Sequence, residues 1–258
     1  MDGALLFAAA PQKNFARVKG NSRQIKGFMV ATVSVKKIDP AALFLDKLPK
    51  PTQQAFLACV QVPLFKSSGW YLAGGTALAL QVGHRESVDL DFFSPQKKIH
   101  ELAVERALFL TGKWNTTLRE AGTIYGTFME VKMSLIAYPF FLPSSQEFRC
   151  GTVRILSPED IAAMKIIAIS QRGRKRDFVD LYWYCLNRES LHVVIGRAVE
   201  QYPGQEQNII HILKSLSFFE DAEKDPMPKI FFKATWPQIK KWFTREAEQA
   251  AKVLLSLG

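Results

Sequence analysis

The pattern of apolar and polar residues over 70–94 predicts a strand, a tight turn, a helix and a second strand in quick succession. The apolar run 70–73 ends at a Gly-Gly pair, and a helical stretch over 76–82 follows. Residues 88–93 then alternate apolar side chains with acids, which is typical of a strand with one polar face. The rest of the chain is organised around this segment.

Helices and strands are predicted on both sides of that segment. Before Ser157, helices are expected over 41–48, 53–62 and 99–111, and strands over 115–120, 123–138 and 151–156. After Ser157 the pattern is helical, with helices expected over 161–172, from 177, and over 189–202, 208–219 and 236–257. The sequence therefore predicts an α/β (α+β) fold, in which a small mixed sheet flanked by helices is followed by a C-terminal helical bundle.

The 258 residues have the composition of a soluble globular protein, with 48% apolar and 22% charged residues. No apolar run reaches the roughly 18 to 20 residues that span a bilayer, so no membrane partner is expected. Three widely separated cysteines favour reduced thiols over a disulfide framework or a zinc cluster. We therefore expect a cytoplasmic protein.

The net charge of +10 lies mostly in the first 38 residues, which hold seven basic residues and one acid. Residues 1–38 show no sustained period, so they are predicted to be a basic leader, either disordered or an extension, and residues 1–28 are interpreted as an upstream extension of the reading frame. Such a leader either binds RNA non-specifically or is a solvated tail. A core domain over 39–156 and a helical domain over 157–258 are expected to follow.

Asp89 and Asp91 give the first chemical signal. They lie two apart in a predicted strand, so their carboxylates share one face and repel each other unless a cation neutralises them. The Gly74-Gly75 turn lets the backbone approach a polyphosphate, and the next helix begins with unpaired N–H groups. Each signal alone is more often an ordinary turn or a solvated acidic edge. Together they predict a site for a metal-bound nucleoside triphosphate.

A second charged cluster is predicted in the helical half. Lys165 and Arg172 are seven residues apart on one helix face, and a glycine turn leads into a helix that carries Arg176 and Asp177. We expect these four side chains to lie near one another. The string RGRKRD that contains three of them is either a solvated charge run or a cationic wall that holds triphosphate oxygens and stabilises the leaving pyrophosphate.

Several strings resemble the AbiEii/AbiGii family of nucleotidyltransferase toxins, which belong to the polymerase-β-type nucleotidyltransferases. They are GGTALAL, the HRxS of residues 84–87, DLDFF, and AMK followed by RDFVDLY, within residues 41–190. The resemblance implies an enzyme that transfers NMP from an NTP and releases pyrophosphate, with Mg²⁺ (or Mn²⁺) as cofactor. It also implies the toxin of a bacterial toxin–antitoxin or abortive-infection system, with an antitoxin partner and an RNA or tRNA acceptor.

The resemblance also implies roles for single residues. The family's essential Lys and Asp fall on Lys165 and Asp177, beside the metal-binding Asp89 and Asp91. The residues expected to bind the nucleotide are Gly74, Gly75, Thr76, Arg85, Ser87, Arg172 and Arg176. For Arg85 a structural salt bridge is the alternative to a phosphate contact. Asp177 either accepts the proton of the attacking hydroxyl or anchors Lys165.

The polymerase-β comparison asks for a third carboxylate on the strand beside the aspartates. Ser134 stands at the expected spacing, and Glu130 is either a further metal ligand or a solvent-facing partner of Lys132. Two aspartates and the triphosphate can still hold Mg²⁺, which commonly takes one or two protein carboxylates. Three other functions stay open: a degenerate nucleotide- or RNA-binding module, a nucleotidyltransferase acting on a protein or small molecule, and a protein whose basic helices bind an acidic antitoxin.

Overall fold

The computed structural model describes residues 35–67, 69–143, 147–203 and 208–256, and all of them belong to one compact unit. Most of the leader predicted over 1–38 lies outside the described residues and stays a prediction. The last part of that leader, Val35–Lys37, forms a short strand (β1) that pairs in parallel with β7 (Glu147–Cys150).

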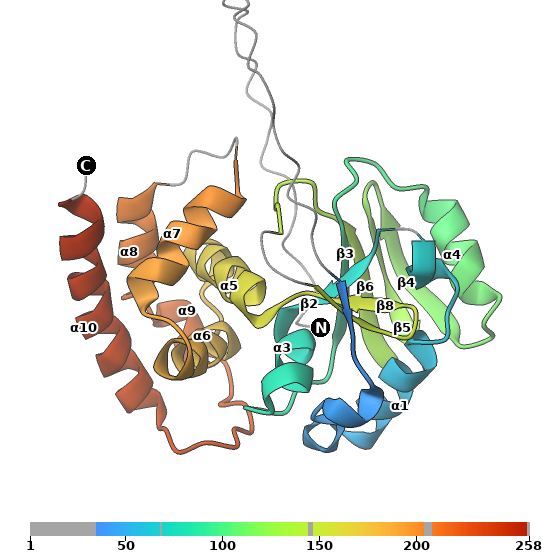
Figure 1. The fold of residues 1–258 in the computed structure, drawn as a ribbon, viewed down its shortest axis with the longest axis horizontal. Helices are drawn as coiled ribbons and strands as arrows, with labels where there is room; N and C mark the ends of the chain where they lie inside the picture. The colour runs from blue at the N-terminus through green and yellow to red at the C-terminus, as the bar shows by residue number, and fades with distance from the viewer. Residues whose placement is uncertain (1–34, 68, 144–146, 204–207, 257–258) are drawn as a thin grey trace, which may run out of the picture. The chain divides into compact units, whose positions relative to one another are not determined.

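The strands of the described residues form one eight-stranded mixed sheet in the order β1-β7-β8-β2-β3-β6-β5-β4 (Figure 1). The remaining strands are β2 (Tyr71–Ala73), β3 (Leu90–Ser94), β4 (Trp114–Glu120), β5 (Thr123–Phe128), β6 (Val131–Ala137) and β8 (Val153–Ile155). The strand that carries the acidic motif, β3, is central and is antiparallel to β2 but parallel to β6.

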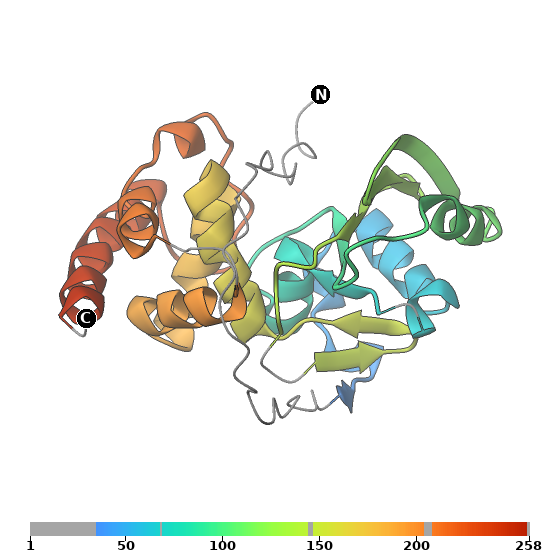
Figure 2. The same ribbon diagram turned by 90° about the horizontal axis from the view of Figure 1, so that it is seen from above.

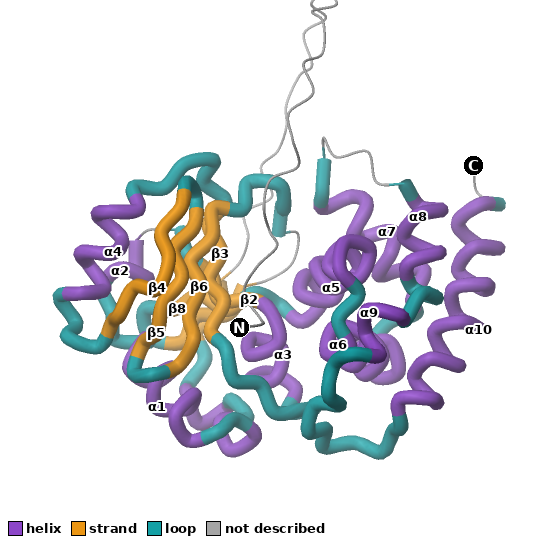
Figure 3. The backbone as a smooth tube through the Cα atoms, turned by 180° about the vertical axis from the view of Figure 1, so that it is seen from behind, coloured by secondary structure: helices purple, strands orange, loops and turns teal. Residues whose placement is uncertain are grey.

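Helices cover the sheet and form a separate group beyond it. They are α1 (Lys50–Cys59), α2 (Leu64–Ser67), α3 (Gly74–Val82), α4 (Glu101–Phe109), α5 (Pro158–Arg172), α6 (Lys175–Asn187), α7 (Leu191–Gln201), α8 (Ile209–Ser215), α9 (Glu220–Glu223) and α10 (Trp236–Leu255). Helices α5–α10 gather on one side of α3, and the strands lie on its other side (Figure 3). Seen from above, α5 and α6 lie between the strands and α10 (Figure 2). The predicted α/β class with a C-terminal helical group is confirmed.

Local side-chain chemistry sets where α5 and α10 begin. The Ser157 hydroxyl accepts a hydrogen bond from the Asp160 amide at 3.2 Å, and Pro158 occupies the first turn of α5. Thr235 and Gln238 form a reciprocal capping box at the start of α10. These caps fix where α5 and α10 begin.

Three predicted elements differ in the structure. The helix expected over 41–48 is instead two 3₁₀ turns, Pro40–Ala42 and Leu45–Lys47, because the Phe44 amide donates to the Leu80 carbonyl at 2.8 Å rather than within a helix. The strand expected over 123–138 turns back on itself where Met129 and Glu130 adopt positive φ.

The strand expected over 151–156 is likewise the second half of a hairpin. Its turn is formed by two residues, Gly151 and Thr152, because Cys150 pairs with Val153. A Cβ on Gly151 would lie 2.3 Å from the Val60 carbonyl oxygen. A two-residue turn leaves no trace in hydrophobic periodicity, so the pattern alone could not find it.

The segment between α9 and α10 returns to the sheet half of the molecule. Ile230 forms an antiparallel bridge with Arg85, the Glu86 amide donates to Lys229 at 2.8 Å, and the Phe231 amide donates to His84 at 2.8 Å. This contact fixes the loop that precedes the acidic strand.

Candidate active site

Asp91 lies in β3, and Asp89 lies one residue before that strand begins; both side chains are half-buried. Because Ala73 pairs with Asp91 across β2 and β3, the turn that follows Ala73 lies against the acid. A Cβ on Gly74 would lie 3.0 Å from Asp91 Oδ2, and Gly74 has a φ of +70°, which other residues rarely adopt. The Gly-Gly turn and the aspartates are therefore adjacent.

Thr76 and Ser87 connect the start of α3 to the acidic segment from inside the protein. The Thr76 hydroxyl is buried, lies 2.9 Å from Ser87 Oγ, and contacts the carbonyl oxygen of Asp89. Both partners of this hydroxyl are internal, and nucleotide binding by Thr76 stays a prediction. The backbone N–H groups at the start of α3 have no side-chain cap, so they are the part of the turn that suits an anion.

Around Asp89, burial and negative charge outweigh the nearby positive charge. Burial and then the neighbouring charge of Asp91 raise the pKa of Asp89, against smaller lowering effects of Arg176 and Lys132. The nearest cation, Arg176, places Nη1 3.5 Å from Asp89 Oδ2. Two adjacent carboxylates with one loosely held cation fit a divalent metal ion, because the ion would relieve the repulsion that raises the pKa.

Ser134 lies on β6 directly beside Asp91, and its hydroxyl donates a hydrogen bond to Asp91 Oδ1 at 2.7 Å. Glu130 does not reach this site. It is exposed in the turn between β5 and β6, with a φ of 65°. Four residues of strand separate it from Ser134, which is roughly 13 Å. The structure therefore does not bring Glu130 to the aspartates.

Lys165 is buried between two acids of α6. Its Nζ lies 2.6 Å from Asp177 Oδ1 and 2.8 Å from Asp180 Oδ2. Burial opposes ionisation of Asp177, but Lys165 and Arg172 outweigh it and hold the pKa of Asp177 below its usual value. Of the two roles considered for Asp177, anchoring Lys165 is the one that these contacts fit.

Asp180 joins this cluster to the loop before the acidic strand. Its carboxylate accepts hydrogen bonds from Arg85 Nε at 2.5 Å and Nη2 at 2.9 Å, and from His84 Nε2 at 2.7 Å. Burial opposes ionisation, but the charges of Arg85 and Lys165 hold the pKa of Asp180 well below its usual range. Burial lowers the pKa of His84 despite its contact with Asp180, so this imidazole is neutral near pH 7. Two anions and two cations thus neutralise one another in the interior.

The buried guanidinium of Arg85 packs against the Gly-Gly turn. Its Nη1 donates to the Glu86 carbonyl at 2.8 Å, and a Cβ on Gly75 would lie only 2.1 Å from Nη2. Because Nε, Nη1 and Nη2 of this buried guanidinium all have protein partners, its geometry fits the structural alternative rather than a direct phosphate contact.

The two remaining arginines of the predicted cluster face different acids. Arg172 places Nε 4.0 Å from Asp177 Oδ2, whereas Arg176 turns toward Asp89. Lys165, Arg172 and Asp177 are therefore brought together as predicted. Arg176 links this cluster to the aspartate pair, and both cations are partly exposed.

Asp180 is the site residue that the sequence analysis did not identify. The available signal was its spacing of three residues from Asp177, which places both acids on one face of α6. The helix looks amphipathic with a charged outer face, but Asp177 and Asp180 are almost fully buried. Only the fold reveals that Lys165 and Arg85 occupy the space opposite them.

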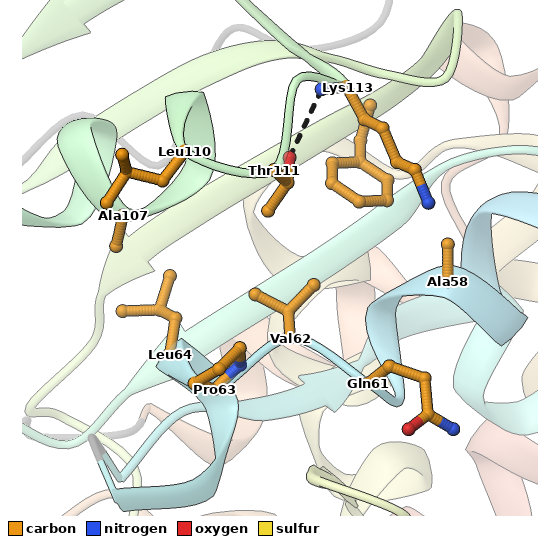
Figure 4. Close-up of a pocket in the computed structure, with 10 residues that line it drawn as sticks. Ala58, Gln61, Val62, Pro63, Leu64, Ala107, Leu110, Thr111 and Lys113 are labelled. Carbon is orange, nitrogen blue, oxygen red and sulfur yellow. Dashed lines mark hydrogen bonds between the residues drawn. The ribbon is translucent and has the colours of Figure 1, made fainter.

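A cavity of about 470 Å³ lies away from this site, between the end of α1, α2 and the end of α4 (Figure 4). Phe128 lines it, and strand alternation places Phe128 on the sheet face opposite Tyr125, the cross-strand neighbour of Ser134. Its lining is mostly apolar and holds no acid. This cavity is therefore separate from the aspartate chemistry.

Comparison with known proteins agrees with the geometry. A family model described as "Nucleotidyl transferase AbiEii toxin, Type IV TA system" matches residues 55–118 and 135–253, more than half of the chain. An uncharacterized protein of Aquifex aeolicus is 29% identical over 207 residues, which are 80% of this chain and 98% of that protein.

Two solved structures are also similar. A protein from H. pylori has 14% identity and a TM-score of 0.48, covering 81% of this chain and 99% of its own. MenT4, a nucleotidyltransferase toxin from Mycobacterium tuberculosis, has 13% identity and a TM-score of 0.41, covering 80% of this chain and 95% of its own. Because both TM-scores are below 0.5, the family assignment rests on the family model.

The family match thus identifies the chain as a nucleotidyltransferase. Within that class, the chain belongs to the AbiEii toxin family of type IV toxin–antitoxin systems. Membership implies an NTP substrate and an antitoxin partner. Among the described residues, no helix is long and apolar enough to cross a membrane.

Proposed function

We propose that this protein transfers NMP from an NTP to the end of an RNA, with tRNA as the expected acceptor, in a reaction that depends on Mg²⁺ (or Mn²⁺) and releases pyrophosphate. The observation that carries the proposal is the contact between the Gly74 turn and Asp91, where a Cβ would lie 3.0 Å from Oδ2. A backbone that suits phosphate and a carboxylate that suits a metal ion meet there, as a metal-bound triphosphate requires.

Asp89 and Asp91 are the proposed metal ligands. When bound, the ion supplies Lewis-acid stabilisation of the phosphate oxygens and orients the attacking hydroxyl. The first N–H groups of α3, from Gly74 and Gly75, are proposed to bind the triphosphate. Thr76 and Ser87 hold this turn against the acidic segment through their hydroxyl contact.

The cations of the helical half stabilise charge that develops on pyrophosphate. Arg172 and Arg176 are partly exposed and can reach a phosphate, whereas Lys165 is held deeper by Asp177. Arg176 lies near enough to Asp89 to exchange that contact for a phosphate oxygen once a cation binds. Positioning and charge stabilisation carry most of this chemistry, so no covalent role is assigned to the protein.

An RNA acceptor is supported by the charge of the chain. The net charge of +10 favours a polyanion over a neutral acceptor, and Lys132 is exposed on β6 two residues from Ser134. We place the reaction in the cytoplasm, where thiols stay reduced. All three cysteines are free, and burial raises the pKa of Cys150 to about 11.

The acceptor is tested by incubating the protein with Mg²⁺, each of four α-labelled NTPs, and a cell extract. The proposal predicts label in an RNA band that ribonuclease removes and protease does not. Label that protease removes would assign the alternative, a nucleotidyltransferase that modifies protein. No label with any nucleotide, although NTP binds, would indicate the non-catalytic binding module.

A further inference from the structure

Ser134 occupies the position at which a third carboxylate would share the metal site. Parallel pairing of β3 with β6 places it beside Asp91, with both side chains on the same sheet face. Ser134 is 6% exposed, so its hydroxyl has little access to solvent. Its donation to Asp91 Oδ1 uses part of that oxygen's capacity and leaves Oδ2, which faces the Gly74 turn. The hydroxyl thus orients a proposed metal ligand instead of adding one.

No other carboxylate of the described residues replaces the missing one. Asp177 and Asp180 are neutralised by Lys165 and Arg85 within the buried cluster. Glu86 forms an ion pair with Lys229 at 2.9 Å. The part of the chain that the structure describes contains no group of three or more His, Cys, Asp or Glu side chains able to hold a metal ion.

The supply of protein ligands then limits the number of ions. Asp89 and Asp91 suit one divalent cation, and Arg176 already lies 3.5 Å from Asp89. In two-metal sites the ions lie about 3.5 to 4 Å apart, and a second ion here would find no further carboxylate among the described residues and would depend on triphosphate oxygens alone. A single Mg²⁺, by contrast, is commonly held by one or two carboxylates and substrate phosphates.

We infer that this site takes one divalent cation per chain, that the ion binds tightly only together with the nucleotide, and that Ser134 sets this limit by orienting Asp91 without contributing a charge. The inference rests on the proposed function, since it concerns the metal of the same site. Its prediction differs from that of the proposed function, because the inference gives the number of bound ions and the proposed function gives the transfer of a nucleotide.

The experiment counts Mn²⁺ by electron paramagnetic resonance on the full chain with one equivalent of an α,β-methylene NTP analogue, which cannot be turned over. The analogue alone, without protein, binds Mn²⁺ weakly and serves as the reference. Relative to that reference, the wild-type complex is expected to bind one additional Mn²⁺ per chain. Without the analogue the affinity should fall by at least about tenfold, as expected when phosphates supply ligands. Two ions of similar affinity in the wild-type complex would overturn the inference.

Two substitutions at one position test the role of the hydroxyl. Ser134→Asp restores a carboxylate and should add a second ion in the analogue complex. Ser134→Ala should keep one ion but weaken it by about tenfold, the usual effect of removing a group that orients a ligand. A Ser134→Ala variant with unchanged affinity, or a folded Ser134→Asp variant with one ion, would contradict the inference. If Ser134→Asp does not fold, the wild-type count still decides.

Failure of the proposed function gives a different result. One ion in the complex, together with no transfer from a hydrolysable NTP to any acceptor, would remove the proposed activity and leave the ion count in place. Two ions in the complex together with RNA labelling would overturn the ion count and support the proposed activity.

Discussion

The two charged regions of this site contain similar residues but are built for different tasks. Asp89 and Asp91 are half-buried, and the only cation within 4 Å of either in the described residues is Arg176. Asp177 and Asp180 are almost fully buried and paired with cations at 2.5 to 2.9 Å. The pKa of Asp89 is raised, whereas the pKa values of Asp177 and Asp180 are lowered.

This difference indicates that the aspartate pair serves the reaction and that the buried cluster serves the fold. A carboxylate whose charge is not neutralised by the protein can bind an incoming cation, whereas one already paired with buried cations has no charge left for it. The buried cluster therefore holds the helical half and the Gly-Gly turn in place. The aspartate pair stays available to bind a cation. Substitutions in the aspartate pair should mainly lower activity, whereas substitutions in the buried cluster should mainly lower stability.

Asp89→Ala should give the largest loss of activity. Removing a metal ligand is expected to lower the rate of nucleotide transfer by about a thousandfold or more, since electrostatic stabilisation is usually the largest catalytic contribution. The free energy of unfolding should be unchanged or slightly higher, because repulsion from Asp91 is relieved. Label transfer and urea unfolding measure the two effects. Full activity in this variant would break the assignment of the aspartate pair.

Asp180→Ala should show the opposite pattern in stability. It leaves Lys165 and Arg85 buried without their shared partner, which typically costs about 3 to 5 kcal/mol. Asp221→Asn, on an exposed residue of α9, is the matched control and should change stability by less than about 0.5 kcal/mol. Urea unfolding of both variants gives the comparison. Equal stabilities would show that the buried cluster does not hold the fold.

Gly75→Ala tests the connection between the two regions. The new Cβ would meet Arg85 Nη2 at 2.1 Å, and Arg85 cannot easily move because Asp180 holds it. A loss of about 1 to 3 kcal/mol is expected, as for other overpacked sites. Gly196→Ala in α7 is the control, since nothing lies within 4 Å of its Cβ, and it should stabilise by about 0.5 to 1 kcal/mol. Thermal unfolding that ranks these two variants in the reverse order would contradict this packing.

Acidification should remove metal binding before it unfolds the protein. The pKa of Asp180 is lowered, so its contribution to stability is complete above the ordinary Asp value of about 3.9 and is lost only below it. The pKa of Asp89 is raised, so protons compete with the metal ion above about 3.9. Mn²⁺ affinity and far-UV circular dichroism, followed over the same pH series, should therefore change at different pH values. A single coincident transition would contradict the comparison.

The aspartate pair could be predicted from the sequence, whereas the buried cluster could be predicted only in part. Asp89, Asp91 and the Gly-Gly turn lie close together in the chain, so local periodicity predicted their strand, helix and common location. Asp180 and Arg85 are 95 residues apart. Their contact depends on how α6 packs beside α3, which no local pattern contains. Of the two alternatives for Glu130, its exposed position fits the solvent-facing one, because the positive φ values of Met129 and Glu130 place it in the turn between β5 and β6.

The most direct test of the central claim compares α-labelled with γ-labelled NTP in the same metal-dependent reaction, with Asp89→Ala alongside. The account predicts that the α label enters an RNA acceptor, that the γ label is released as pyrophosphate, and that the variant does neither. Transfer of the γ label to the acceptor, or equal α-label transfer by the variant, would contradict it.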